Sequence, residues 1–377
     1  MIQQLSYWEK DTFFKTYDAA IIGGGIVGLL SAVKIKEQNP SWSVVILERA
    51  TIPYGATTRN AGFACFGSLS ELLSDEQKMG QAAMLQLVDK RIEGLEILMA
   101  TAGKENIDFQ PIGGYELFTP AQESLYQNCC LETERMNVLL QSITKNSTTF
   151  ANVNEQIAPF KFKNLLGMIY NPMEGGVHSG KLAKTLIEKA NKLGINIFNG
   201  CEVLGLEEKQ DLQIIKSKYF DVKAYKVVIA TNAFTQDILP VEDLEPGRGQ
   251  VLITKPISNL PFEGTFHLEE GYFYFRTIAN RVLFGGGRHL DFEKENTTDF
   301  ELNSFIQNHL ELLLQTVILP TTPFEIDYRW TGIMAFGSSK LPIIKTTSQN
   351  TILAIRCNGM GIALAGSIAK EVAKLIA

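Results

Sequence analysis

The sequence is poor in cysteine, and the few cysteines follow no pattern. Its 377 residues include only Cys65, Cys129, Cys130, Cys201 and Cys357. An odd count without a repeated spacing argues against a disulfide framework and against a zinc site. Because disulfides are rare in reducing compartments, we expect a cytoplasmic protein with free thiols.

Histidine is equally scarce. His178, His267, His289 and His309 are scattered along the chain, and they predict neither a metal cluster nor a catalytic triad. No Gly-x-Ser-x-Gly segment and no pair of carboxylates stands out. We therefore interpret the histidines as structural or surface groups, and we name no metal and no catalytic side chain.

The chain also has no basic stripe. Lys and Arg number 35 against 41 Asp and Glu, which gives a formal net charge of −6. Proteins that bind nucleic acid or anionic lipid concentrate positive charge on one face. We therefore expect a small-molecule partner and no nucleic acid.

No apolar run is long enough for a membrane span. The longest uncharged apolar stretch lies between Asp18 and Lys34, and it is shorter than the ~20 residues that cross a bilayer. Glu9, Lys10 and Asp11 precede it, where a signal peptide would carry a basic region. We expect neither a membrane span nor a signal peptide.

What the chain does contain is a globular composition and a complete βαβ pattern near its start. Hydrophobic residues make up 45% and charged residues 20%, as in folded proteins. The apolar run at 19–22 predicts a parallel strand that is covered on both faces. Residues 26–38 have helical spacing, Pro40 ends that helix, and residues 43–47 predict a second buried strand.

A dinucleotide fingerprint lies at the turn of this unit. Gly23 permits a tight turn, Gly25 lets the backbone approach a pyrophosphate, and Gly28 allows the helix to pack closely on the strand. Glu48, at the end of the second strand, can accept hydrogen bonds from both ribose hydroxyls. A carboxylate there disfavours NADP, but the fingerprint alone leaves NAD and FAD open.

The rest of the chain predicts an α/β protein, with a Rossmann-like dinucleotide-binding domain and an inserted, largely antiparallel α+β substrate domain. Helices are expected over 70–102, 121–143, 180–193 and 299–316, with a closing helix after 358–361. Strands are expected at 195–198, 201–206, 212–216 and 226–230, and alternating strands at 251–254, 272–276 and 282–284. The expected boundaries are 1–75, 165–238 and 325–377 for the first domain, and 76–164 and 239–324 for the second.

Several segments resemble the D-amino-acid oxidase family of FAD-dependent oxidoreductases, which includes glycine oxidase, sarcosine oxidase and D-amino-acid dehydrogenase. The resemblance begins with the glycine turn and Leu47-Glu48-Arg49, and it keeps the family's order over nearly the whole chain. The matching segments are 22–33, 47–49, 54–62, 227–234, 248–250, 272–276, 284–287, 329–332 and 358–361.

The resemblance implies FAD as the cofactor. Family members with covalent flavin carry a cysteine near residue 334, and this chain has none between Cys201 and Cys357, so we expect non-covalent binding. Asn358 is expected to cap the closing helix, whose positive end would face the flavin. The residues expected at the cofactor are Gly23, Gly25, Ile26, Val27, Gly28, Glu48, Arg49, Thr57, Thr58, Arg59, Asn60, Ala61, Gly62, Val203, Thr231, Asn232, Gly332, Asn358, Gly359, Met360 and Gly361.

The expected substrate residues are Tyr272, Tyr274, Arg276 and Met334. The first three alternate, so one strand face carries two phenols and a guanidinium that can bind a carboxylate. Met334 stands where amino-acid oxidases of the family place their carboxylate-binding arginine. Either Arg276, Arg59 or Arg329 takes over that role, or the substrate lacks an α-carboxylate.

The function implied by the resemblance is oxidation of the C–N bond of a small amine or amino acid. Hydride passes to flavin N5, and the resulting imine hydrolyses. Three alternatives stay open: oxidation of a hydroxy acid, a flavin-binding protein without turnover, and modification of an aminomethyl group on a nucleic-acid base, which the net charge disfavours. The strand over 281–287 lacks the lysine by which related oxidases promote reaction with oxygen, so the electron acceptor, oxygen or another carrier, stays open.

Overall fold

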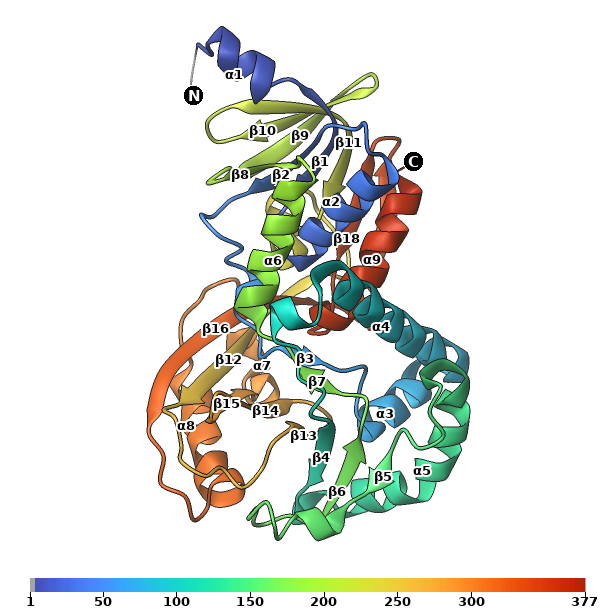
Figure 1. Cartoon of the computed structure of the whole chain (residues 1–377), viewed down its shortest axis with the longest axis vertical. Helices are drawn as coiled ribbons and strands as arrows, with labels where there is room; N and C mark the ends of the chain where they lie inside the picture. Colours follow the sequence, from blue (N-terminus) through green and yellow to red (C-terminus); the bar gives the residue numbers. More distant parts are fainter. Residues whose placement is uncertain (1–3, 377) are drawn as a thin grey trace.

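The computed structural model describes residues 4–376, and within them two eight-stranded sheets occupy the two halves of the molecule (Figure 1). In the first sheet the strand order is β17-β18-β11-β1-β2-β8; β10 pairs with the start of β11, and β9 pairs with β10. The strands are β1 (Thr16–Ile22), β2 (Val44–Glu48), β8 (Asn196–Asn199), β9 (Val203–Lys209), β10 (Leu212–Ser217), β11 (Asp221–Ile229), β17 (Ile343–Ser348) and β18 (Thr351–Ile355).

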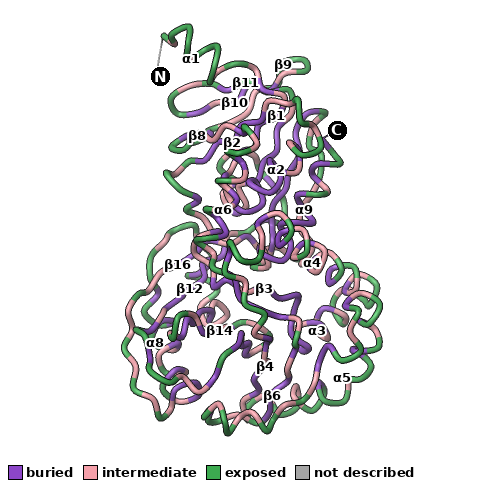
Figure 2. The backbone as a smooth tube through the Cα atoms, in the orientation of Figure 1, coloured by how far each residue is buried: buried purple, intermediate pink, exposed green. Residues whose placement is uncertain are grey.

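The centre of the first sheet is parallel and buried on both faces. β1 pairs in parallel with β11 and β2, and its last four residues are at most 2% exposed. Helices α2 (Ile26–Gln38), α6 (Ser179–Lys192) and α9 (Gly361–Leu375) cover one face, and the β9–β10 hairpin packs on the other. Figure 2 shows the strands of this centre as buried. The βαβ unit predicted near the start of the chain is confirmed.

The second sheet is mostly antiparallel, in the order β16-β12-β15-β14-β13-β4-β6-β5. One face packs against α8 (Ser304–Leu313) through a phenylalanine-rich core, in which the rings of Phe266 and Phe275 stack 4.4 Å apart. Its strands are β4 (Gly114–Phe118), β5 (Ala151–Asn152), β6 (Gly167–Asn171), β12 (Glu245–Thr254), β13 (Thr265–Leu268), β14 (Phe273–Ile278), β15 (Arg281–Gly286) and β16 (Ile326–Phe336).

Two of the predicted helices have different bounds in the structure. The single helix expected over 70–102 is two helices, α3 (Leu69–Met79) and α4 (Gln81–Ala102), because Gly80 adopts a φ of +84° that no α-helix can contain. The helix expected over 299–316 begins only at Ser304, where Asn303 caps it, and continues as a π-helical turn over Leu314–Ile318. Helix α5 (Glu123–Thr144) lies where the spacing predicts it.

The two halves meet where α4 packs on α9. A Cβ added to Gly94 would lie 1.9 Å from the carbonyl oxygen of Ala363, and one added to Gly366 would lie 2.2 Å from that of Gly94. Two glycines therefore let the two helix backbones touch. This contact fixes the start of α9 relative to the inserted helices.

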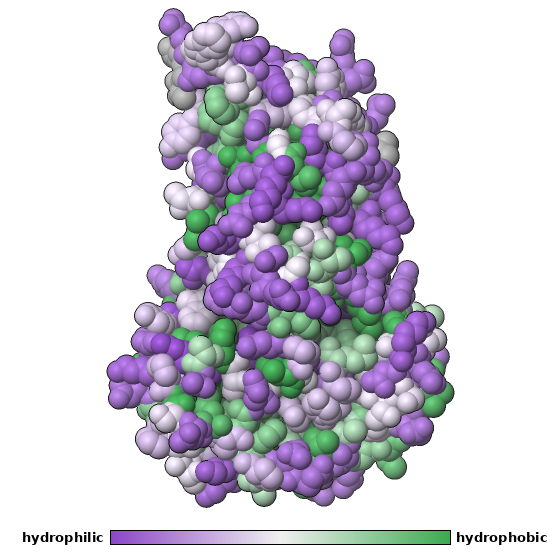
Figure 3. Space-filling view, viewed as in Figure 1, coloured by the Kyte–Doolittle hydropathy of each residue, from purple (hydrophilic) through white to green (hydrophobic). Residues whose placement is uncertain are grey.

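The predicted fold class is confirmed, and the structure also contains elements that were not predicted from the sequence. Strands β16–β18 and the short α1 (Tyr7–Thr12) were not expected, and β6 and β16 join the second sheet although their residues fall in ranges expected for the first domain. The exact domain boundaries stay a prediction. On the face drawn in Figure 3, hydrophobic residues are scattered among hydrophilic ones. Among the described helices, none combines the length and the apolar character that crossing a bilayer requires.

Candidate active site

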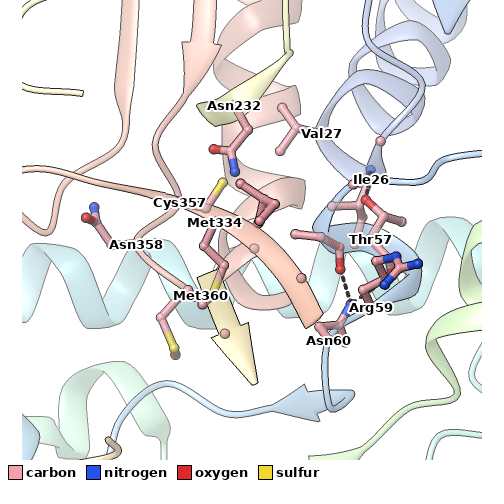
Figure 4. A pocket seen from close by; sticks show the side chains of 18 of the residues that line it. Ile26, Val27, Thr57, Arg59, Asn60, Asn232, Met334, Cys357, Asn358 and Met360 are labelled. Atoms are coloured by element: carbon pink, nitrogen blue, oxygen red, sulfur yellow. Dashed lines mark hydrogen bonds between the residues drawn. The ribbon is translucent and has the colours of Figure 1, made fainter. Parts of the chain in front are cut away.

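A cavity of about 720 Å³ extends from the glycine turn after β1 to the second sheet (Figure 4). Its walls come from the β1–α2 turn, the loop around the short helix η1 (Ala56–Thr58), the start of α9, and strands β12, β14 and β16. Of the residues expected at the cofactor, all but Gly28 and Thr58 line it. Segments far apart in the sequence therefore converge on one site.

The glycine turn is shaped by close backbone contacts. Gly23 has a φ of +104°, and a Cβ on it would lie 2.7 Å from the carbonyl oxygen of Ala230. A Cβ on Gly28 would lie 1.9 Å from the carbonyl oxygen of Gly23, so Gly28 serves helix packing behind the cavity. Gly25 is the N-cap of α2, and its Cβ position meets only the Thr57 hydroxyl, at 3.1 Å. The turn thus leaves a side-chain-free surface toward the cavity.

Glu48 lies at the floor of this turn, 7% exposed. Its Oε2 accepts a hydrogen bond from the Gly24 N–H at 2.8 Å, and its Oε1 accepts one from the Ala50 N–H at 3.0 Å. Burial raises the pKa of the Glu48 carboxyl, while these two backbone N–H groups and Arg49 act against that rise. Each carboxyl oxygen keeps acceptor capacity for a ligand hydroxyl.

The loop after η1 is held in shape by Asn60. Its amide nitrogen donates to the carbonyl oxygens of Ala56 and Thr57, and its Oδ1 accepts from the Gly62 N–H at 2.8 Å. The Thr57 hydroxyl in turn accepts from the Ile26 N–H at 2.9 Å, which ties the loop to the first turn of α2 (Figure 4). Thr58 does not line the cavity, and its hydroxyl donates to the carbonyl oxygen of Pro53.

Helix α9 begins in the cavity wall without a side-chain cap. Its N-cap is Met360, so the expectation that Asn358 caps this helix is wrong. The Asn358 amide instead donates to the carbonyl oxygens of Ser339 and Arg356. The first N–H groups of a helix have no partner within the helix, so an uncapped start offers hydrogen-bond donors and a partial positive charge to a ligand.

Opposite α9, Met334 and Tyr274 close the cavity over a glycine of the second sheet. A Cβ on Gly249 would lie 2.9 Å from Cε of Met334 and 3.6 Å from the Tyr274 hydroxyl, and one on Gly359 would lie 3.8 Å from Sδ of Met334. Met334 therefore lies between the start of α9 and Tyr274. Burial raises the pKa of Tyr274 to about 12, so this phenol stays protonated at neutral pH.

Arg276 lies outside the cavity wall, contrary to the prediction that it contacts the substrate. The side chain is 1% exposed, and one guanidinium nitrogen donates to the carbonyl oxygens of Gly62 (2.7 Å) and Val177 (2.9 Å). Burial lowers its pKa to about 10. Strand alternation correctly puts Arg276 on the face of Tyr274, but the loop around Gly62 lies over that part of the face.

The other arginines that the sequence offered for a carboxylate differ in position. Arg329 is committed to Gln307 and Glu311 at 2.7 Å each and lies outside the cavity wall. Arg59 lines the cavity, donates to the carbonyl oxygen of Thr331, and lies over the ring of Tyr54. Tyr272 lines the cavity just before β14 begins.

Sequence reasoning missed His267, which lines the cavity from β13. Its Nε2 lies 2.8 Å from Oε2 of the buried Glu174. Burial alone would lower the pKa of His267, but the carboxylates of Glu174, Glu116 and Glu71 together outweigh burial and raise it. The register places His267 beside Tyr274 on β14 and Glu116 on β4. Nothing in the sequence connects His267 with Glu174, because 92 intervening residues separate them and only the sheet brings them together.

Cys65 completes a buried group with His267 and Glu174, with ligand atoms within 4.8 Å of one another. Burial and the nearby carboxylates of Glu174 and Glu71 raise the pKa of the Cys65 thiol, so it stays protonated. Metals bind the thiolate. The group has the spacing of a metal site, and a metal bound there would have to displace the thiol proton.

A second unpredicted group borders the same end of the cavity. Lys340 lies 3.1 Å from Glu71 and 2.7 Å from Asp75, and Glu71 also pairs with the buried Arg91 at 3.3 Å. Although burial alone would raise it, these cations hold the pKa of Glu71 below its usual range. These four charges neutralise one another and fix α3 to the cavity wall.

Together the fold and the cavity define an oxidoreductase that uses a dinucleotide cofactor. The family model described as "FAD dependent oxidoreductase" (DAO) matches residues 18–375, and the chain belongs to this family. The protein is therefore a FAD-dependent enzyme of the amine and amino-acid oxidase and dehydrogenase group. The side-chain-free turn, the buried Glu48 and the uncapped start of α9 fit such a cofactor.

Individual relatives are distant but cover the chain. The gamma-glutamylputrescine oxidoreductase of Escherichia coli is 24% identical, over 96% of this chain and 84% of its own length. The glycine oxidase of Geobacillus kaustophilus has a TM-score of 0.77 at 19% identity, over 96% of this chain and 94% of that one. The L-proline dehydrogenase of P. horikoshii has a TM-score of 0.75 at 18% identity, over 97% and 94%. These two structures share the fold.

Proposed function

We propose that the protein oxidises the C–N bond of a small amine or amino acid. The observation that carries the proposal is the continuity of the cavity, which joins the dinucleotide turn at Gly23 to a wall of the second sheet that includes Met334, Tyr274 and His267. When bound, FAD would supply a two-electron acceptor for hydride from the carbon next to nitrogen, and the imine product would hydrolyse.

The residues expected at the cofactor divide into three roles under this proposal. Glu48 accepts hydrogen bonds from ribose hydroxyls, and the backbone of the loop from Thr57 to Gly62 donates to the pyrophosphate. The uncapped start of α9 would stabilise negative charge that develops on the bound cofactor. Met334 and Tyr274, which line the cavity, would exclude water from the substrate and orient it.

Cofactor binding is proposed to be non-covalent. Cys65, Cys201 and Cys357 line the cavity, but burial raises the pKa of each thiol, that of Cys357 to about 12. A covalent link needs a thiolate nucleophile, and none of these thiols supplies one at neutral pH.

Oxidation of a hydroxy acid is the second candidate, and His267 with Glu174 favours it. A neutral amine can lose hydride without a protein base, whereas an alcohol must give up its hydroxyl proton. Above its raised pKa, His267 is neutral and can accept that proton at the cavity wall.

The test is the visible spectrum of the purified holoenzyme under anaerobic conditions. D-amino acids, N-methyl amino acids, polyamines and 2-hydroxy acids are added one at a time. Bleaching of the flavin bands by an amine supports the proposal, and bleaching only by hydroxy acids supports the second candidate. Flavin that no amine bleaches contradicts amine oxidation. Admitting air afterwards separates an oxidase, whose bands return, from a dehydrogenase.

A further inference from the structure

Arg288 lies in the cavity wall, outside the dinucleotide turn and outside the position of Met334, where family members bind a substrate carboxylate. Arg288 follows β15 in the short helix η6 (Arg288–Leu290) and lines the cavity. Its Nε is buried and has no hydrogen-bond partner. Within residues 4–376, no carboxylate oxygen lies within ion-pair distance of its guanidinium, whereas Arg276, Arg329 and Arg248 are all engaged.

Aromatic rings hold this guanidinium in place. Its Cζ lies 4.3 Å from the ring centre of Phe336 and 4.9 Å from that of Phe292. Burial lowers the pKa of Arg288, and Glu245, Tyr272 and Glu295 offset this effect only in part. Arg288 is a half-buried cation without a close counter-ion, so the site favours an anionic ligand group that would pair with it.

Strand β12 shows how far Arg288 lies from Met334 and Tyr274, the residues proposed to orient the substrate. A Cβ atom added to Gly247 would contact Phe336 and would lie 2.8 Å from Nε of Arg288. A Cβ atom added to Gly249 would contact Met334 and the Tyr274 hydroxyl. These two glycines are two residues apart, which is about 7 Å along a strand. The free cation therefore lies about that far from the Met334–Tyr274 end.

We propose that Arg288 binds a carboxylate of the substrate that is several bonds away from the oxidised C–N carbon. This inference rests on the proposed function and narrows its substrate class to amines with a distant acidic group. It also accounts for Met334: the carboxylate is held by Arg288 at the far end of the cavity, and no cation is needed beside the reacting carbon.

The first test measures binding without turnover, by calorimetry on the oxidised holoenzyme with pentanoate and its neutral counterpart pentanamide. We expect pentanoate to bind tighter by roughly tenfold or more, equivalent to about 1.4 kcal/mol. Arg288→Gln should abolish this preference. The matched control Arg281→Gln, which removes an arginine of β15 already paired with Asp327, should keep it.

The second test measures reduction of the bound flavin. 5-Aminopentanoate should half-saturate at a concentration roughly tenfold below that of pentylamine, and Arg288→Gln should bring the two together. Equal binding of pentanoate and pentanamide by the wild-type holoenzyme, or an undiminished preference in Arg288→Gln, overturns the proposal. If Arg288→Gln does not retain flavin, the wild-type comparison decides. Flavin that no amine bleaches would contradict the proposed function, while the calorimetric preference would still test the anion site.

Discussion

At the residue scale, Gly25 is the position where an added side chain affects the cofactor with least harm to the fold. Its Cβ would meet only the Thr57 hydroxyl, so the apoprotein tolerates a larger residue, but the side chain would project toward the expected pyrophosphate. Gly25→Val should therefore lower the affinity for FAD by roughly tenfold or more, about 1.4 kcal/mol. The measurement is flavin absorbance per protein after titration with FAD.

The control for this prediction is Gly205→Val. Gly205 lies on β9 with open space at its Cβ position, so the valine should leave flavin content unchanged. A yellow Gly25→Val protein with wild-type affinity would contradict our placement of the pyrophosphate.

The pair of His267 and Glu174 predicts a pH dependence of stability. The pKa of His267 is raised in the folded state by Glu174, so the pair stabilises the fold below the unfolded value of about 6.5. This stabilisation is lost as pH rises through the raised folded pKa, because the folded state then gives up the extra proton. The same region also contains Glu116, Glu71, Cys65 and Tyr274. These residues are unchanged in the Glu174→Gln variant, so they contribute equally to both proteins.

Glu174→Gln should flatten that pH dependence and cost about 3 kcal/mol at acidic pH, since it leaves a buried imidazolium without its carboxylate. Chemical unfolding between pH 5 and 9 measures both effects. His178→Gln, at the exposed start of α6, is the control and should keep the wild-type slope. An unchanged slope in Glu174→Gln would mean that His267 is neutral throughout.

How much of the site the sequence could predict depends on the range of the signal. The glycine turn and Glu48 are local patterns with one structural solution, and the structure puts them in the cavity as expected. The roles of Arg276 and His267 depend on which distant loop lies above a strand face. For Arg276 that loop is the one around Gly62; for His267 it is the segment that carries Glu174.

At the scale of elements, the contact between α4 and α9 links the inserted helices to the cofactor site. Gly94→Ala would place a methyl group 1.9 Å from the backbone of Ala363 in the first turn of α9. We expect a loss of about 1–3 kcal/mol in the free energy of unfolding. Because α9 would shift, weaker FAD binding should accompany that loss.

Thermal unfolding and FAD titration check this prediction together. Gly180→Ala in the first turn of α6 is the control, because its Cβ position has no contact closer than 3.3 Å. If Gly94→Ala matched Gly180→Ala in both measurements, the close contact would not position α9.

Element boundaries were harder to predict than element types. Apolar spacing runs unbroken across Gly80 and gives no sign of the turn there, because helical periodicity does not register the backbone angle of one residue. Strands β16–β18 were not predicted: β16 and β17 lack a clear alternation of apolar and polar residues, and β18 is a run of only five residues. Cross-strand pairing makes them strands: β16 pairs with β12, β18 with β11, and β17 with β18.

At the scale of the whole molecule, the cavity lies between the two sheets, so the cofactor is expected to contact both. We also expect no covalent link between protein and cofactor, because none of the three cavity thiols is a thiolate at neutral pH. Precipitation with acid should therefore release intact FAD into the supernatant and leave a colourless pellet. Absorbance of the two fractions is the measurement. A yellow pellet would show a covalent link.

Gly249, on the cavity side of β12, is a position at which one substitution can alter the length of the ligand space. At Gly249 an added methyl group would meet the flexible end of Met334, 2.9 Å away, with the Tyr274 hydroxyl at 3.6 Å. The strand itself would not need to move. A single codon change there can therefore shorten the space for a ligand without disturbing the sheet, and this makes β12 the natural starting point for evolving or engineering a different substrate length.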